Sequence, residues 1–356
     1  MTLSTNTFKL TPYFATEETK SASTILVVED LEAPVNRLVT GILYVSAAMT
    51  NIQGDIDAGG APRQNATNLK GILSSAGYKR KIRDTVQMIF DVPMHVNRRG
   101  VLLQGNLDAA LAKAPDSQAT TKLKDFVFKQ RATLAKAKVK DEAVSSKDDD
   151  SKKTEKKEKA EKGEDWSEVV KACFQYFFDD RTFGRLFTDP VNEGSTGPVQ
   201  ISHFLSLHPI EIIEMAVACT AVANWKEKEE KHSTIGRVSV VNYGLYEGTL
   251  VCNPFHAAHT GFSWNDLNKI LNVIPLLWDI TQSSSRTGVA HERMTLFVHD
   301  SPTGSMSLAD CKKLAHPINA NPSAPDMPRQ STDDYEFKSL EELNEGLNPG
   351  VKVAII

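Results

Sequence analysis

The first hundred residues contain three distinct patterns of apolar and polar positions. Residues 37–49 are apolar on both faces and rich in β-branched side chains, which is typical of a buried central strand. Residues 51–63 contain three glycines and a proline and predict a loop. Apolar residues then recur at helical spacing from Ile82 to Phe90, so we expect a helix over residues 74–90.

The middle of the chain predicts a mixture of helices and strands. Residues 165–177 combine a capping pair with one apolar face, as a helix does, and residues 197–207 alternate as a strand does. Residues 211–230 fit either element, because their Ala, Glu and Met content favours a helix while their β-branched run favours a strand. Residues 263–278 predict a helix that Pro275 kinks.

Short strands complete the pattern. We expect one to start at residues 185–187, two at residues 237–243 and 249–252 around a turn, and a short last strand at residues 294–298. The order of strand, helix, strands, helix and strand suggests an α+β fold with a split βαβ, or ferredoxin-like, core and long insertions.

Composition is consistent with one large domain with insertions or with two modest domains, since 40% of the 356 residues are hydrophobic. No apolar run approaches the ~18 residues that span a bilayer, and the first 20 residues lack the pattern of a signal peptide. The four cysteines are far apart and form no CxxC pair, as in reduced cytoplasmic proteins. We therefore expect a cytoplasmic protein without a membrane partner.

The net charge of −4 argues against nucleic acid until its distribution is considered. Residues 1–36 carry a charge of −3 and residues 321–356 a charge of −4, which leaves +3 for the body between them. Because salt screens distant charges, a mildly basic body with acidic ends can hold RNA in a local groove.

Residues 136–165 form a low-complexity segment with ten lysines and ten acidic residues. A balanced run this polar cannot bury a core, so we expect a flexible surface insertion. A positive RNA-binding tail would need a net charge that the segment lacks.

The glycine-rich loop, residues 51–63, is the first candidate for binding chemistry. Glycines such as Gly54 permit positive φ and let backbone N–H groups approach a phosphate, while Asn51 adds a polar contact and Arg63 adds charge. A tight surface loop whose aspartates bond its own backbone explains the same residues equally well. Neither the Walker nor the Rossmann pattern fits.

A basic cluster follows the loop and contains Lys79, Arg80, Lys81 and Arg83. Lys79 and Arg83 share a helix face at i, i+4 spacing. A solvated helix face is one explanation, but contact with phosphate is favoured because the glycine-rich loop leads into this helix.

Metal-dependent chemistry is a weaker alternative. Asp55 with Asp57, or Asp179 with Asp180, could bind a metal for hydrolysis, but two-metal nucleases need more convergent carboxylates. The cysteine and two histidines of residues 252–259 have zinc-like spacing without an evident fourth ligand.

Several segments together resemble the backbone subunits of type I-C and I-B Cascade, the CRISPR surveillance complex, within the repeat-associated RNA-binding superfamily. In chain order they are NIQGDIDAGGAPR (51–63), YKRKIRD (78–84), DDRTFG (179–184), TGPVQ (196–200), HPIE (208–211), TIGR (234–237), YGLY (243–246), TGFSWNDL (260–267) and FVHDS (297–301). Each segment alone is weak, whereas their shared order is specific. Gln53, Ile56 and Asp180 depart from the family's pattern, so the subtype stays open.

The resemblance implies a hand-shaped, non-catalytic subunit without a cofactor. An RRM-like palm with thumb and fingers would occupy residues 37–320, with the thumb at about residues 203–237, between an N-terminal extension (1–36) and an acidic C-terminal extension (321–356). Copies would stack head to tail along a guide RNA, kink it at intervals and leave its bases free to pair with target DNA. Other Cascade subunits would be further partners.

By position in these motifs, the resemblance and the basic cluster together nominate ten residues for RNA contact. They are Asn51, Gly54, Arg63, Lys79, Arg80, Lys81, Arg83, Arg181, Gly184 and Arg237. Two rival classes stay open: a guide-dependent ribonuclease that uses Asp55 or Asp57, and an assembly protein that binds no nucleic acid.

The composition of residues 136–165 generates the first prediction. Replacing residues 138–163 with a short Gly/Ser link should leave the thermal unfolding midpoint nearly unchanged, because doubling a flexible loop changes its closure free energy by only ~0.6 kcal/mol. A large loss of stability would mean that the segment packs against the body.

Overall fold

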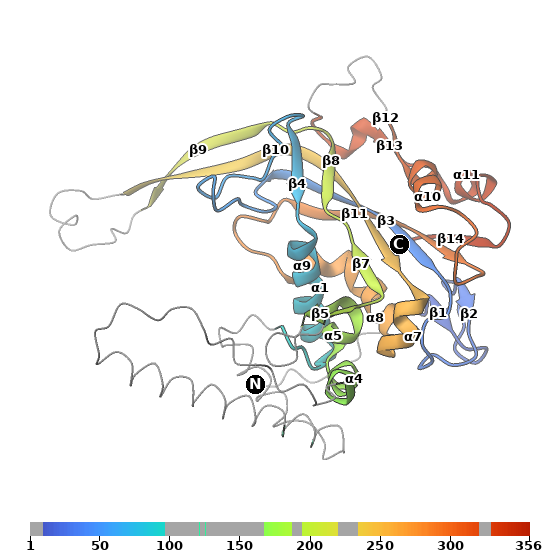
Figure 1. Ribbon diagram of the computed structural model, residues 1–356. Coiled ribbons are helices and arrows are strands. Elements are labelled where there is room, and N and C mark those ends of the chain that lie inside the picture. The colour runs from blue at the N-terminus through green and yellow to red at the C-terminus, as the bar shows by residue number, and fades with distance from the viewer. Residues whose placement is uncertain are drawn as a thin grey trace, which may run out of the picture.

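The structure is a computed structural model that describes residues 10–96, 121, 125, 167–186, 194–219, 234–319 and 329–356 (Figure 1). The charged insertion expected at residues 136–165 lies outside this set. Within it, the architecture is a large β-sheet with helices on both faces, which confirms the expected mixed α and β composition. None of the helices so described is long and apolar enough to cross a membrane.

Three long strands form the centre of the main sheet. β3 (Val39–Thr50) lies between β10 (Thr234–Cys252) and β11 (Val289–His299), antiparallel to both. β3 is buried along nearly its whole length, as the apolar run at residues 37–49 predicted.

Shorter strands extend the sheet on either side, in the order β14-β11-β3-β10-β8-β4. β7 and β9 pair with the two ends of β10. The bounds of these strands are β4 (Lys70–Leu73), β7 (Val199–Ile201), β8 (Phe204–Pro209), β9 (Ile212–Cys219) and β14 (Val351–Ile355). The C-terminal residues, expected as an extension, therefore supply an edge strand of the main sheet.

Two helices cover the first face of the sheet. α1 (Ser75–Phe90) and α8 (Trp264–Val273) pack their apolar residues against the sheet in the largest hydrophobic core. A capping box at Ser263 begins α8, and Pro275 lies in a short 3-10 turn, η1 (Ile274–Leu276), that separates it from α9 (Leu277–Ile280). The predicted break at Pro275 is confirmed.

The C-terminal part of the chain covers the second face. α10 (Leu308–Ala315) packs there against Tyr44 and Phe297 in a smaller core. The neighbouring elements are β12 (Ile318–Asn319), η2 (Thr332–Asp334), β13 (Tyr335–Glu336) and α11 (Leu340–Glu345).

Small elements lie around the ends of the two long helices. They are β1 (Phe14–Ala15), β2 (Leu26–Val27), α4 (Ser167–Tyr176), α5 (Phe178–Phe183), β5 (Gly184–Leu186), β6 (Gly194–Thr196) and α7 (Pro254–Thr260). The side chain of Asn268 on α8 bonds both the N–H and the carbonyl of Phe14, which fixes β1 against that helix.

The ambiguous stretch at residues 211–230 is strand where the structure describes it. β9 and the outer half of β10 form an antiparallel ribbon that projects beyond the sheet (Figure 1). β9 lies within the range expected for the thumb, residues 203–237, and the β10 half of the ribbon continues to Val241. Residues 220–233, between these strands, are outside the described set.

The expected turn between residues 237–243 and 249–252 is wrong, because β10 is a single strand of 19 residues. Its glycines mark tight packing instead. A Cβ at Gly248 would lie 2.6 Å from the ring of Phe204, and one at Gly244 would lie 2.9 Å from Ile210. The last expected strand was also too short, since β11 spans 11 residues and β14 follows it.

The packing at Gly248 generates a prediction. Gly248→Ala should lower the free energy of unfolding by about 1 to 3 kcal/mol, because the added methyl overpacks against Phe204. Gly236→Ala in the same strand is the control, since its Cβ would meet nothing closer than 3.7 Å and should change stability by less than ~0.5 kcal/mol. Equal denaturation midpoints for the two variants would contradict the packing argument.

Candidate nucleic-acid interface

The glycine-rich loop after β3 closes on its own backbone. The N–H of Asp55 donates to Ala61 O at 2.8 Å, and the N–H of Gly60 donates to Asp55 O at 2.6 Å. A Cβ at Gly54 would lie 2.7 Å from Gly60 O, so only glycine lets the two halves of the loop approach. The Asp57 N–H also donates to the Asp55 carboxylate, as expected for a self-bonded loop.

Two polar side chains of this loop do not use all of their hydrogen-bonding groups. Asn51 donates through Nδ2 to Gly60 O at 2.8 Å, while its buried Oδ1 has no hydrogen-bond partner within the described part of the chain. Arg63 makes a long bond from Nε to Gly54 O (3.4 Å) and a loose ion pair with Asp55 (3.6 Å). Because the free oxygen of Asn51 is buried, Arg63 is the one of the two that can contact a ligand from solvent.

Gln53 fastens the loop to the first turn of α1. Its Oε1 accepts from the Ser74 N–H at 2.6 Å, and its Nε2 donates to Ser74 Oγ at 2.8 Å. Ser74 itself caps the helix by accepting from Gly77 N–H. The loop and the basic helix are therefore one rigid unit.

Lys79 and Arg83 share a face of α1, as their spacing predicted. The Lys79 ammonium lies 5.3 Å and the Arg83 guanidinium 4.6 Å from the centre of the Phe183 ring, on α5. Lys79 Nζ donates to Gln200 Oε1 (3.2 Å), and Arg83 Nε donates to Asp179 Oδ2 (3.2 Å). The arrangement holds both cations in fixed positions over one aromatic platform.

The charge of Lys79 is not balanced by a carboxylate in any described contact. Burial, followed by the nearby charge of Arg83, lowers the pKa of Lys79 below its ordinary value of 10.5. A phosphate beside the pair would favour the charged form of the lysine and relieve this repulsion.

The other two cations of the cluster point elsewhere. Lys81 donates to both the carbonyl and the hydroxyl of Thr281 at 2.7 Å and lies 5.2 Å from the centre of the Trp278 ring, so it binds the end of α9. Arg80 is 58% exposed, and among the described residues its one ion pair is a distant one with Asp84 (3.9 Å).

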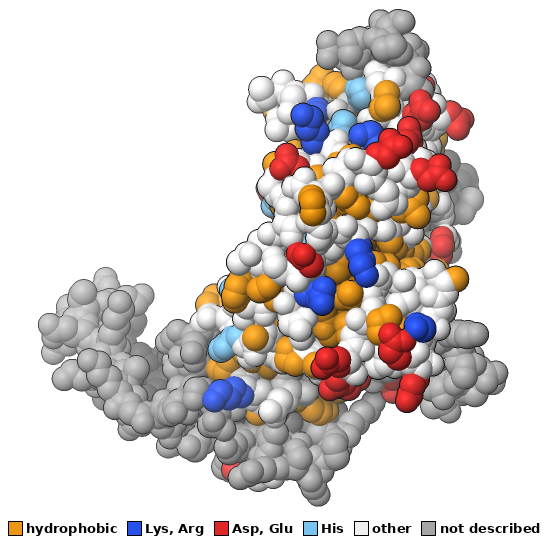
Figure 2. Space-filling view, turned by 90° about the vertical axis from the view of Figure 1, so that its right-hand side faces the viewer, with side chains coloured by type: hydrophobic (Ala, Val, Ile, Leu, Met, Phe, Trp, Pro, Cys, Tyr) orange, Lys and Arg blue, Asp and Glu red, His pale blue; other side chains and the backbone are white. Residues whose placement is uncertain are grey.

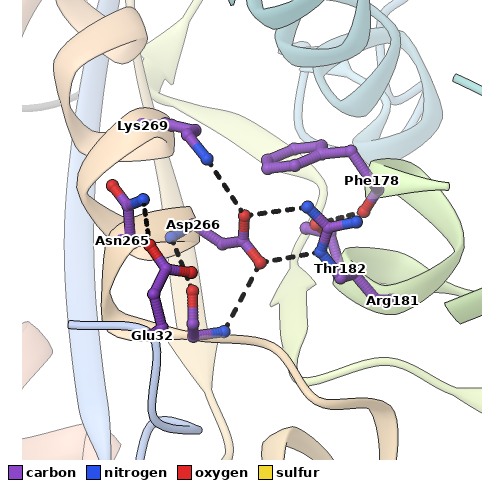
Figure 3. A network of polar contacts seen from close by, with 8 residues as sticks. Glu32, Phe178, Arg181, Thr182, Asn265, Asp266 and Lys269 are labelled. Atoms are coloured by element: carbon purple, nitrogen blue, oxygen red, sulfur yellow. Dashed lines mark hydrogen bonds and ion pairs between the residues drawn. The ribbon is translucent and has the colours of Figure 1, made fainter. Parts of the chain in front are cut away.

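Arg181 lies in a buried network instead of at the surface (Figure 3). Its Nε and Nη2 donate to the two oxygens of Asp266 at 2.7 and 2.9 Å, and Lys269 reaches the same carboxylate at 3.4 Å. Burial raises the pKa of Asp266, but the hydrogen bonds and charge of Arg181 outweigh this and hold it below its ordinary value.

The acidic pair on α5 is equally occupied. Asp179 accepts from the backbone N–H groups of His95 (2.7 Å) and Val96 (2.9 Å) in addition to Arg83, and Asp180 contacts the His95 ring at 2.8 Å. Both carboxylates are at most 2% exposed. Their geometry is that of structural anchors.

The remaining metal hypothesis and Gly184 have structural explanations too. Cys252 is fully buried at the end of β10, and burial raises the pKa of its thiol. No group of three metal-ligating side chains occurs among the described residues. Gly184 has a φ of +76°, and a Cβ there would lie 2.2 Å from Ser195 O, so this glycine closes the β5–β6 hairpin.

The loop that carries Asn51, Gly54 and Arg63 is thus joined through Gln53 to the start of α1, which carries Lys79 and Arg83 on one face. Arg237 is exposed on the outer part of β10 opposite Ala216. The sequence interpretation missed two supporting residues, Phe183 and Gln200. Phe183 lay inside a motif that had been noted, but its contact with α1 depends on tertiary packing and has no local signal.

Figure 2 shows a different end of the molecule, the right-hand side of Figure 1, where β14, α10, α11 and the N-terminal strands lie. Lys and Arg side chains are scattered there among acidic and apolar ones. This mixed face contrasts with the concentration of cations along α1.

Comparisons with known proteins show which family and which solved structures this chain is similar to. A family model described as CRISPR-associated protein Cas7 matches residues 37–339. Among solved structures, one chain of a "CRISPR RNA-guided surveillance complex, pre-nicking" is 15% identical, with 87% of each chain covered and a TM-score of 0.48. A chain of another "CRISPR RNA-guided surveillance complex" is 13% identical, covering 86% of this chain and 81% of that one, with a TM-score of 0.38. No curated protein matches the sequence.

The Arg181–Asp266 pair generates a prediction about stability. Arg181→Ala should lower the free energy of unfolding by about 3 to 5 kcal/mol, because it leaves the buried Asp266 carboxylate without its main partner. Arg80→Ala is the matched control and should cost less than ~0.5 kcal/mol.

The same pair predicts a pH dependence. Because the folded pKa of Asp266 lies below its ordinary 3.8, the contribution of the pair is present above that pH and is lost as the pH falls through the lower folded pKa. The difference in stability between the native protein and Arg181→Ala should therefore be complete at neutral pH and shrink in the acid range, as the Asp266 carboxylate is protonated first in the variant and then in the native protein. A difference that instead fades between pH 6 and 8 would implicate another group.

Proposed function

This chain belongs to the CRISPR-associated protein Cas7 family, and on that premise we propose that it is a non-catalytic backbone subunit of a type I CRISPR surveillance complex. Several copies would polymerise along a guide RNA. The observation that carries the proposal is the pair Lys79 and Arg83, held over Phe183 beside the glycine-rich loop.

An RRM-like palm is part of the proposal. Strands β11, β3, β10 and β8 are neighbours in the sheet in that order, and each pair is antiparallel. Along the chain, α1 lies between β3 and β8, and α8 lies between β10 and β11. This strand order and these two crossovers support a ferredoxin-like palm.

We place the guide backbone along α1 and the glycine-rich loop. Lys79, Arg80 and Arg83 would meet phosphates, with Arg63 beside them on the loop and Asn51 supporting the loop through its bond to Gly60 O. Contacts of this kind carry little sequence information, as a protein that accepts any guide requires.

Three of the remaining nominated residues support this surface from behind. Lys81 fixes α1 to α9, Arg181 fixes α5 to α8, and Gly184 shapes the β5–β6 hairpin. Gly54 allows the loop to close.

The β9–β10 ribbon fits the thumb that would cross the guide, kink it and lie on the neighbouring copy, with Arg237 on its outer part. Such a head-to-tail contact is heterologous and need not close, which gives a helical filament. Target DNA would pair with the guide bases, other Cascade subunits would be further partners, and the complex would act in the cytoplasm.

We assign no catalysis to Asp55 or Asp57. The alternative, a guide-dependent ribonuclease, would use these carboxylates, but Asp55 pairs with Arg63 and accepts from the Asp57 N–H within the loop. Both interactions support a structural role.

Removal of positioned charge tests the proposal. Arg83 pairs with the buried Asp179, so reversing its charge would test folding as well as binding. Lys79→Gln combined with Arg80→Gln avoids this problem. It should weaken binding of unrelated single-stranded RNAs alike and lower the slope of log affinity against log salt by up to ~1.4, since each neutralised phosphate contributes ~0.7.

The matched control is Lys20→Glu with Lys313→Glu, which changes two exposed lysines away from α1. The control changes the net charge by more than the Lys79→Gln/Arg80→Gln variant does, and it should still bind RNA normally. An equal loss in both double variants would show that overall charge drives binding. Magnesium-dependent cleavage of the RNA that disappears in Asp55→Ala would favour the ribonuclease alternative.

A further inference from the structure

A second polar pocket lies on the face of the sheet that α10 covers only in part. Its volume is about 330 Å³, and its walls come from β4, β8, β10, the link between β7 and β8, and the end of α10. The chemically active lining residues are Lys70, His203, Glu247, Thr249, Lys312 and His316. The proposed path of the guide along α1 does not use these residues.

Glu247 organises one wall of the pocket. This buried carboxylate, in the middle of β10, accepts from the Tyr44 hydroxyl (2.9 Å), Lys312 Nζ (2.7 Å) and His316 Nδ1 (3.0 Å). Burial raises its pKa, but the hydrogen bonds from His316, Lys312 and Tyr44 outweigh this and lower it below 4.5. The carboxylate therefore holds three donor side chains in place, of which Lys312 and His316 line the pocket.

Lys312 still presents donors to a ligand. Its side chain is 51% exposed, and an ammonium has three N–H donors, of which Glu247 uses only part. His316, also 51% exposed, donates to Glu247 through Nδ1 and borders the pocket as a neighbour that reports on its contents.

His203 supplies a donor whose tautomer is fixed by the backbone. Its Nδ1 lies 3.1 Å from the backbone N of Ser75, the first residue of α1. A backbone N–H can only donate, so Nδ1 accepts and the ring proton of the neutral form is on Nε2. His203 consequently offers an N–H without needing to be protonated.

Lys70 adds an uncompensated charge. Its ammonium makes no ion pair or hydrogen bond with any residue that the structure describes, although its backbone is fixed in β4. The charges of Lys70, Lys312 and Glu247 sum to +1 in the pocket. The lining therefore attracts an anion that accepts several hydrogen bonds.

We propose that this pocket binds a phosphate group, and specifically one from the backbone of a nucleic-acid strand that continues past α1. The volume is near the lower end of the about 300 to 1,000 Å³ typical of ligand pockets, which suits one small group. Cationic and N–H donors converging on tetrahedral oxygens are the usual recognition chemistry for phosphate.

The connection to the α1 surface favours a strand over free phosphate. Lys79 bonds Gln200 on β7, and three residues later His203 bonds the first turn of α1, so one short segment borders both sites. A strand that follows α1 toward its N-terminus meets this segment and then the pocket. This choice of source rests on the proposed function, whereas the phosphate chemistry of the pocket does not.

The first experiment uses the full-length protein without RNA. Inorganic phosphate is titrated while the side-chain resonances of the histidines are followed by NMR, with His203 and His316 assigned by single substitutions. Both resonances should shift in the native protein. The shifts should disappear in Lys70→Glu and persist in Lys313→Glu, a control with an exposed lysine on the adjacent helix α10. If Lys70→Glu alters the thermal unfolding midpoint, Lys70→Met is used in its place.

The second experiment distinguishes the two sources of phosphate. Salt-dependent binding of single-stranded RNA should lose ~0.7 in slope for Lys70→Glu if one strand phosphate occupies the pocket. Phosphate-induced shifts with an unchanged RNA slope would overturn the strand and leave free phosphate as the ligand. Histidines that do not respond to phosphate, or that respond equally in Lys70→Glu, would overturn the site. If the native protein binds no RNA, the proposed function fails, and the phosphate titration still decides the pocket.

Discussion

Two buried arginine–aspartate pairs converge on the short helix α5 and join it to both long helices of the first sheet face. Asp179 pairs with Arg83 of α1, and Arg181 pairs with Asp266 of α8. α5 has only six residues, so its own hydrogen bonds cannot make it rigid. The two ion pairs, with Phe183 under the α1 cations, fix the distance between helices that the sheet alone would not determine.

The elements with strong local patterns could be predicted from the sequence. The apolar run of β3, the helical spacing of α1 and the helix at residues 263–278 with its break at Pro275 each depend on neighbours within one element, and all three are confirmed. The resemblance to CRISPR backbone subunits, which rested on the order of short motifs, is confirmed by the match to the Cas7 family. The turn expected between residues 243 and 249 was wrong, because Gly244 and Gly248 make room for Ile210 and Phe204 within one continuous strand.

The candidate site could be predicted only in part, for a related reason. Four neighbouring cations looked equivalent, yet each residue along a helix turns its side chain by about 100°, and they meet different surroundings. Lys81 meets the end of α9 and Arg80 meets solvent, while Lys79 and Arg83 meet Phe183. Arg181 and Asp266 are 85 residues apart, so no local sequence pattern indicates that the arginine is paired with this carboxylate.

Because β10 is a single strand, the projecting ribbon is anchored at one end, in the sheet, and extends freely from it. At ~3.3 Å per residue its 19 residues extend for roughly 60 Å, and they pass without interruption from the ribbon into the most buried part of the sheet. At Val241 the strand changes partners: β9 pairs with it outward from this residue, and β3 supports it inward. Bending is therefore concentrated at the end of β3, near Thr50, next to the glycine-rich loop. A force that pushes the ribbon sideways would therefore displace Asn51, the first residue of that loop, before it displaces the rest of the sheet.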